Sequence, residues 1–160
     1  TVIRGTPALV QLLIMYFIIL SSPDISKTMV AVVTFGINSG AYVAEIFRSG
    51  ILSVDAGQME AGRSLGLGYV DTMTQIIMPQ AIKNCLPALV NEMIALLKET
   101  SICGYIGLAE LTRGGDIIRG VTFEALLPLI AVAIVYLIIV MFFTWIMSLL
   151  ERRLRESDIR

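Results

Sequence analysis

The sequence predicts an all-α protein, a polytopic bundle of membrane-spanning helices. Its residues are 56% hydrophobic and its mean hydropathy is +0.83. Only 16% are charged, whereas a soluble domain usually carries about 25%. The apolar residues also gather in long runs, and residues 126–150 contain 25 positions without a charge. A run of about 20 apolar residues can cross a bilayer as a helix.

Four segments predict membrane spans. Residues 7–20 are apolar except for Gln11, but this run is shorter than the roughly 20 residues that a spanning helix needs. We therefore expect the first helix to include residues 1–6. Residues 28–47 and 126–150 predict the second and fourth spans, and the third runs from residue 81 to about residue 105.

The third predicted span is unusually polar. A charge at the centre of a bilayer costs about 2.5–3.5 kcal/mol even on lenient scales, so this helix must be surrounded by protein or face water. Residues 104–120 follow as a polar external segment that can hold short surface helices. The polar side chains of the third span are Lys83, Asn84, Asn91, Glu92, Lys98, Glu99, Thr100 and Ser101.

One proline and three glycines in the first two spans predict helix geometry. Pro7 is expected to kink the first span, because proline cannot donate to the helical ladder. Gly5 is expected to let a neighbouring helix come close. Gly36 and Gly40 are four residues apart, and small residues at this spacing allow two helices to approach closely.

Residues 55–79 lie between two apolar segments and predict a short helix, a turn and a second helix. Asp55 can cap the first helix with its carboxylate, and the Gln58 side chain can reach back to that cap. Gly66 and Gly68 stand where the helix should stop and the chain reverse. The second helix begins over residues 69–78, and Pro79 must kink or restart it.

Composition excludes several other classes of protein. The net charge of −1 gives no support for nucleic-acid binding. The absence of histidine removes Ser-His and Cys-His catalysis together with the commonest metal ligand. Cys85 and Cys103 are too far apart in sequence to suggest a zinc or redox motif, so we expect two free thiols that pack as small apolar groups. The sequence also has no phosphate-binding loop motif.

The distribution of basic residues predicts the orientation, because cytoplasmic loops are enriched in Lys and Arg. Eight basic residues fall on the side of the 55–79 loop and three on the other, which places the loop and the C-terminus in the cytoplasm. The eight are Arg4, Arg48, Arg63, Lys83, Arg152, Arg153, Arg155 and Arg160, and the three are Lys27, Arg113 and Arg119.

The loop resembles the "EAA" loop, Glu-Ala-Ala-x3-Gly-x9-Ile-x-Leu-Pro, of ABC importer permeases. The matching residues are Glu60, Ala61, Gly66, Ile76 and Pro79. Gly62 replaces the second alanine and should soften the helix by about 1 kcal/mol relative to Ala. Met78 replaces the leucine, which is close to volume-neutral.

The rest of the chain resembles the branch of these permeases that imports polar amino acids. The likeness covers nearly the whole chain with its spacing intact, at residues 4–7, Gln11, residues 38–48, residues 91–92 and residues 97–101. It implies the core of a type I ABC importer permease, with residues 1–160 as its transmembrane domain. Such permeases have five spans, so we expect an N-terminally truncated chain with four spans visible.

The resemblance implies that the loop is a coupling helix for a separate ATPase. The residues expected to take part are Gln58, Glu60, Ala61, Gly62, Arg63, Gly66 and Pro79. ATP and Mg would belong to that partner, with no cofactor in this chain. The other expected partners are a second permease subunit, identical or related, an extracytoplasmic solute-binding protein, the amino acid and the lipid of the cell membrane. The alternative is an amphipathic helix that lies at the lipid interface.

The substrate path is expected along the third span. Glu92 and Glu99 are seven residues apart and project toward nearly the same helix face, and Asn91 and Lys98 repeat that spacing. A buried acid suits an ammonium group or a cationic side chain. The alternative is that Glu92 or Glu99 pairs with Lys98, or with a charge on a neighbouring span, and fixes helix packing. Asn38 and Gln11 are expected either to orient the zwitterion or to bond between helices.

A second hypothesis is an ATP-independent channel or secondary carrier. In that protein Glu92 and Lys98 would serve as an ion relay, and the 55–79 loop would only pack. A neighbouring gene with a phosphate-loop ATPase motif favours the importer. An intramembrane enzyme lacks support, because the sequence offers neither histidine nor a carboxylate pair with a nucleophile.

Overall fold

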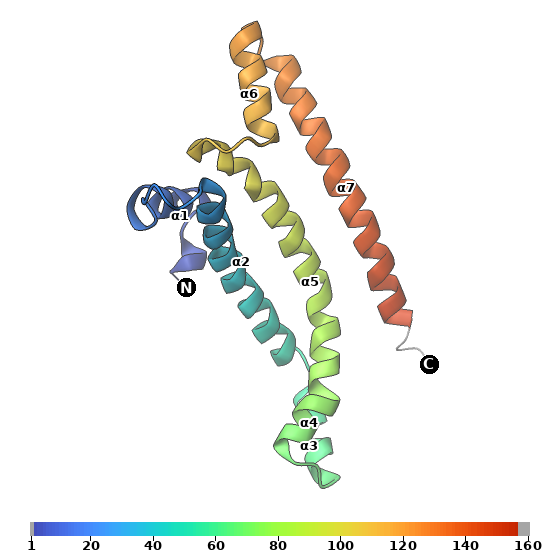
Figure 1. Ribbon diagram of the computed structural model, residues 1–160. Coiled ribbons are helices and arrows are strands. Elements are labelled where there is room, and N and C mark those ends of the chain that lie inside the picture. Colours follow the sequence, from blue (N-terminus) through green and yellow to red (C-terminus); the bar gives the residue numbers. More distant parts are fainter. Residues whose placement is uncertain (1, 157–160) are drawn as a thin grey trace. The chain divides into compact units, whose positions relative to one another are not determined.

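The computed structural model of the protein describes residues 2–156 and confirms the all-α prediction. Helices account for most of these residues, and no strand occurs among them (Figure 1). The elements in chain order are η1 (a 3-10 helix, Ile3–Gly5), α1 (Ala8–Ile14), η2 (a π-helix, Met15–Ile19), α2 (Lys27–Leu52), α3 (Ala56–Ser64), α4 (Tyr69–Thr72), η3 (a π-helix, Met73–Ile77), α5 (Met78–Glu99), η4 (a 3-10 helix, Thr100–Ile106), α6 (Leu111–Thr122) and α7 (Leu126–Glu156).

The chain divides into two compact units. The first combines the residues up to Ala41 with Met93–Trp145, and the second combines Tyr42–Glu92 with the chain from Ile146 onward. The long helices α2 and α5 each contribute one end to each unit. The two units are therefore described separately.

The first unit has its core where α1 meets the start of α2 and η4. Leu12 of α1 is fully buried, and it packs in one cluster with Ala31 and Phe35 of α2 and with Cys103 and Ile106 of η4. These side chains lie on one face of each element. Burial of this apolar face holds the short helix α1 in place, since a helix of this length is not stable alone.

The N-terminal segment differs from its prediction. Residues 1–6 were expected to extend the first helix, but Ile3–Gly5 forms a 3-10 turn and the backbone of Thr6 and Pro7 is extended. A proline disfavours the helical conformation in the residue before it, so the chain cannot continue as a helix through Thr6. Pro7 occupies the N-cap position of α1 and does not kink it. Thr1 lies outside the described residues.

Two of the predicted spans have the length and composition of a membrane-crossing helix. These are Lys27–Leu52 and Leu126–Leu149, with mean hydropathies of 1.5 and 3.0. The apolar helix Ala8–Ile19 is shorter. The third predicted span begins earlier and ends earlier than expected, because α4, η3 and α5 follow each other without a break and the α-helix stops at Glu99.

The helix does not restart at Pro79 but changes its winding just before it. Residues Met73–Ile77 form the π-helix η3, in which the N–H of Met78 donates to the carbonyl of Met73. Pro79 is the second residue of α5, and it has no N–H to donate to the helical turn before it. A π turn is a recognised local response to irregularity in the helical ladder.

The external segment predicted at residues 104–120 contains the helix α6. Glu110 caps it, since its carboxylate accepts hydrogen bonds from the N–H groups of Thr112 and Arg113 at 2.7 and 2.6 Å. A Cβ atom at Gly115 would lie 2.6 Å from Cγ2 of Val132. The absence of a side chain at this glycine therefore allows α6 to pack closely against the start of α7 (Figure 1).

Close approach occurs at glycines other than the predicted ones. A Cβ atom at Gly5, Gly36 or Gly40 would meet nothing within 4 Å among the described residues. Gly50 and Gly62, both in the second unit, are instead in tight contact with neighbouring helices. Sequence spacing alone does not indicate which glycine faces a neighbour within the same chain.

Candidate functional site

The predicted coupling helix is present as α3, and its first turn is capped as expected. Oδ1 of Asp55 accepts a hydrogen bond from the N–H of Gly57 at 2.7 Å. This contact satisfies one of the N–H groups that a helix start leaves free. Within the described part of the chain, no hydrogen bond is recorded for the Gln58 side chain, so the predicted reach back to the cap is not formed.

The end of α3 is a Schellman motif. Gly66 has a φ of +87°, and its N–H donates to the carbonyl of Arg63 at 3.0 Å. The N–H of Leu67 donates to the carbonyl of Gly62 at 3.2 Å. These are the two bonds that define this helix ending, and they confirm the prediction that Gly66 stops the helix.

Gly62 is a contact point as well as a weak helix former. It is buried, and a Cβ atom there would lie 2.5 Å from Cγ2 of Thr72 and 3.1 Å from Cδ1 of Ile76. Thr72 is fully buried, and its hydroxyl donates to the carbonyl of Gly68 at 2.9 Å. The glycine that departs from the family pattern therefore lets α3 pack directly against α4 and η3.

The other predicted coupling residues are each exposed, and we call this set of residues the α3 surface. It consists of Gln58, Glu60, Ala61, Arg63, Gly66 and Pro79, all of them exposed. Three apolar side chains beside it are also exposed: Leu65 at 82%, Tyr69 at 57% and Val70 at 67%. Tyr69 and Val70 were not among the residues predicted for this site. The sequence signal that could have indicated both residues is that they are large and apolar and follow the helix-stopping Gly66 in a polar loop.

In the first unit, the structure brings the predicted residues Gln11 and Asn38 together. Nδ2 of Asn38 donates to Oε1 of Gln11 at 3.0 Å, and Asn38 is only 3% exposed. Nε2 of Gln11 donates to the carbonyl of Ile3 at 2.6 Å and to Oγ1 of Thr6 at 2.6 Å. The pair thus links α1 to α2 and holds the N-terminal 3-10 turn against α1.

The remaining predicted path residues lie on α5. Asn91 and Lys98 are exposed, and Glu92 and Glu99 are half-buried. Asn91 and Glu92 belong to the second unit, whereas Lys98 and Glu99 belong to the first. Residues seven apart therefore have the same exposure: the two acids are the more buried pair, and Asn91 and Lys98 are the more exposed pair.

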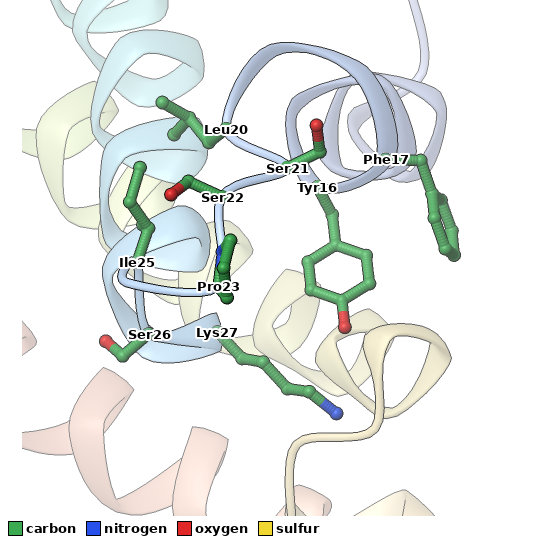
Figure 2. A pocket seen from close by; sticks show the side chains of 9 residues that line it. All are labelled: Tyr16, Phe17, Leu20, Ser21, Ser22, Pro23, Ile25, Ser26 and Lys27. Carbon is green, nitrogen blue, oxygen red and sulfur yellow. The ribbon is translucent and has the colours of Figure 1, made fainter.

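The first unit also has a cavity of about 560 Å³ beside the start of α2 (Figure 2). Nζ of Lys27 lies 5.9 Å from the centroid of the Tyr16 ring, which is within the range of a cation–π contact. None of the predicted path residues contributes to this cavity. Its lining is Tyr16, Phe17, Leu20, Ser21, Ser22, Pro23, Ile25, Ser26 and Lys27.

The chain as a whole is similar to known membrane proteins. Residues 1–156 match the model of the family described as "Binding-protein-dependent transport system inner membrane component". The chain belongs to this family. It is therefore a transport permease, and the all-α fold is that of a type I ABC importer permease.

Curated relatives of the permease include transporters of two amino acids. It is 41% identical over 160 residues to the arginine transport system permease protein ArtQ of Bacillus subtilis, covering 99% of this chain and 73% of the relative. It is 45% identical over 157 residues to the glutamine transport system permease protein GlnP of Escherichia coli, covering 96% and 72%.

Solved structures give the same result. The permease matches a chain from a crystal structure of an amino acid ABC transporter with histidines, with a TM-score of 0.87 and 50% identity, over 95% of this chain and 72% of that one. A chain of the MetNI methionine ABC transporter in an inward-facing conformation matches with a TM-score of 0.78 at 18% identity, over 96% and 71%. The second match supports the fold alone.

Family membership also defines what this permease does not do. In an ABC importer the ATPase activity belongs to a separate subunit, so the permease itself is not an enzyme. Among the residues that the structure describes, no group of His, Cys, Asp or Glu is arranged to hold a metal ion.

Proposed function

We propose that this permease is the membrane subunit of an ATP-driven importer of polar or charged amino acids, which works by alternating access. The relatives carry names of arginine and glutamine transport systems, and one solved neighbour is an amino acid ABC transporter. ATP binding on the partner would bias the equilibrium between two states of the membrane helices.

The observation that carries the proposal is the α3 surface. A helix that transmits motion must be held in one position, and α3 is capped by Asp55, ended by Gly66 and packed through Gly62. Its exposed residues are then free to bind a groove on an ATPase subunit, which would hold ATP and Mg. The exposed side chains of Leu65 and Tyr69 give that interface an apolar component, as protein interfaces require.

The proposed substrate path follows α5. Glu92 is the principal residue, because an acid within a membrane helix usually marks a pathway or a partnered charge. Its carboxylate suits an α-ammonium group or a cationic side chain. Asn91, Lys98 and Glu99 would line the path along the same helix. Asn38 and Gln11 would shape the path by holding α1 against α2.

The remaining partners follow from the importer architecture. Two permease subunits, identical or related, would enclose the path, and an extracytoplasmic solute-binding protein would deliver the substrate. The excess of basic residues on the α3 side supports a cytoplasmic location for α3 and the C-terminus. The exposed apolar side chains of α7, including Leu137, Ile138 and Trp145, would face lipid in the cell membrane.

The experiment is co-purification of the permease with its partner ATPase, followed by transport in vesicles. A Glu60→Ala/Gly66→Ala variant is expected to lose the ATPase and ATP-driven uptake together. Asp24→Ala is the matched control, because Asp24 is an exposed acid in the loop before α2, and it should retain both. Uptake that persists in the double variant without any bound ATPase would instead support an ATP-independent channel or carrier.

A further inference from the structure

The coupling helix is attached to two long helices, and both attachments lie in the second unit. α2 ends at Leu52 and α3 begins at Ala56, so only three residues separate them. After α3, the chain returns through α4 and η3 into α5. A displacement of α3 could be passed to α2, to α5 or to both, depending on how firmly these two helices are joined (Figure 1).

The two helices are in close contact at Gly50 of α2. A Cβ atom at Gly50 would overlap Sγ of Cys85 and would lie 3.0 Å from the carbonyl oxygen of Ala81. Cys85 and Ala81 are each 1% exposed. The contact is therefore made by the backbone of one helix and a short, buried side chain of the other.

Hydrogen bonds between the helices flank this contact on both sides. Sγ of Cys85 donates to the carbonyl of Ile46 at 3.3 Å, one turn before Gly50. Nδ2 of Asn84 donates to Oγ of Ser53 at 2.9 Å, one turn after it. Ser53 in turn donates to the carbonyl of Gly50 at 2.7 Å, which fixes its hydroxyl for the bond with Asn84.

This contact has little capacity to absorb movement. Large side chains can change rotamer when two helices slide, but glycine has no side chain and cysteine has only one heavy-atom torsion. Closely packed groups also shift between discrete arrangements and do not deform continuously. The second glycine contact, between Gly62 and Thr72, joins α3 to α4 and η3 in the same manner.

We propose that Gly50 and Cys85 form a joint that fixes the end of α2 to the start of α5, so that displacement of α3 moves both helices as one body. The proposal rests on the coupling function proposed above. It makes Gly50 and Cys85, both buried, positioning residues that would act by keeping the two helices together during transport.

The native cysteines allow a direct test. Cys85 and Cys103 are the only two in the sequence, so a Cys103→Ser background leaves one thiol to follow. The assembled transporter with its ATPase would be treated with a maleimide in the nucleotide-free state and in the ATP–vanadate state. The joint predicts that Cys85 stays unlabelled in both, whereas labelling in either state would show that the helices separate and would overturn the proposal.

Transport variants give the second readout. Gly50→Ala is expected to lower the uptake per ATP hydrolysed by about 2- to 30-fold, the range over which single substitutions change coupling, and to expose Cys85. The ATPase should still co-purify, since the α3 surface is unchanged. Gly50→Ala/Cys85→Ala removes the overlapping sulfur and should recover most of the uptake per ATP hydrolysed. If Gly50→Ala acted only by general destabilisation, the second substitution would not restore this value.

Gly120→Ala is the matched control, because a Cβ atom at Gly120 in α6 would meet nothing within 4 Å. Its uptake per ATP hydrolysed should equal that of the parent. If the parent transports and Gly50→Ala keeps the parent ratio with Cys85 unlabelled, the joint is refuted and the importer function stands. If the parent itself shows no ATP-driven uptake, the proposed function fails first.

Discussion

Gly62 and Thr72 fit together so closely that a Cβ atom on the glycine would lie 2.5 Å from Cγ2 of the threonine. Thr72 cannot turn away easily, because it is fully buried and its hydroxyl is bonded to the carbonyl of Gly68. The glycine thus lowers the intrinsic stability of α3 but allows its contact with the next helix. A side chain at this position is therefore expected to favour the helix and to disfavour the packing.

The first prediction is that Gly62→Ala destabilises the coupling loop. The gain of about 1 kcal/mol in helix propensity should be outweighed by overpacking, which typically costs about 1–3 kcal/mol. Hydrogen exchange of the α3 amides is the measurement, and exchange should become faster. Thr72→Ser removes the methyl group while keeping the hydroxyl, so Gly62→Ala/Thr72→Ser should exchange more slowly than Gly62→Ala alone. Equal or slower exchange in Gly62→Ala than in the parent would contradict the prediction.

The second prediction concerns the left-handed backbone at Gly66. Gly66→Ala places a Cβ atom on a residue with a φ of +87°, which costs about 1–2 kcal/mol. Fraying of the last turn of α3 should follow, with weaker retention of the ATPase on purification. Gly68→Ala is the control, because Gly68 has a φ of −65° that alanine adopts, and the added Cβ atom would meet only the end of the Asp71 side chain, at 3.1 Å. Similar losses in the two variants would show that backbone strain is not the cause.

The third prediction concerns the hydrogen bond between Asn38 and Gln11. Asn38→Leu leaves Oε1 of the half-buried Gln11 without its donor, and a buried polar group that is left unsatisfied costs about 1–3 kcal/mol. Thermal inactivation of the purified transporter should therefore occur at a lower temperature. Replacing both residues in Gln11→Leu/Asn38→Leu should cost less than the sum of the single changes. Strict additivity would mean that the bond contributes nothing.

The fourth prediction separates transport from assembly. Glu92→Gln removes the charge and keeps the size, so uptake and substrate-stimulated ATP hydrolysis should fall while the ATPase still co-purifies. Glu124→Gln alters an exposed acid between α6 and α7 and should leave uptake unchanged. If the Glu92 variant transports and stimulates hydrolysis like the parent, Glu92 has no part in the path.

Local signals in the sequence were enough to predict α3. The Asp55 cap, the Gly66 stop and the apolar run of α7 each depend on a few neighbouring residues and on rules of helix formation. The prediction failed at residues 1–6 because membrane thickness was used to extend the helix, whereas Pro7 decides the local backbone.

The contacts between helices could not be predicted in the same way. Gly50 and Cys85 are far apart in sequence, and nothing in their local pattern indicates that they meet. Gly36 and Gly40 carry the spacing of a close helix contact, yet within this chain the contact is at Gly50. Which face of a helix meets a neighbour depends on the three-dimensional packing of the elements, which spacing along one helix does not determine.

The π-helix η3 has a consequence for comparing members of the family. A π turn holds one residue more than an α turn of the same rise, so the segment from Met73 to Ile77 contains one residue that a regular helix would not need. A homologue one residue shorter here could wind this turn as ordinary α-helix and keep both α3 and α5 in place. A one-residue gap aligned to this segment would then mark a change of winding and leave the architecture unaltered.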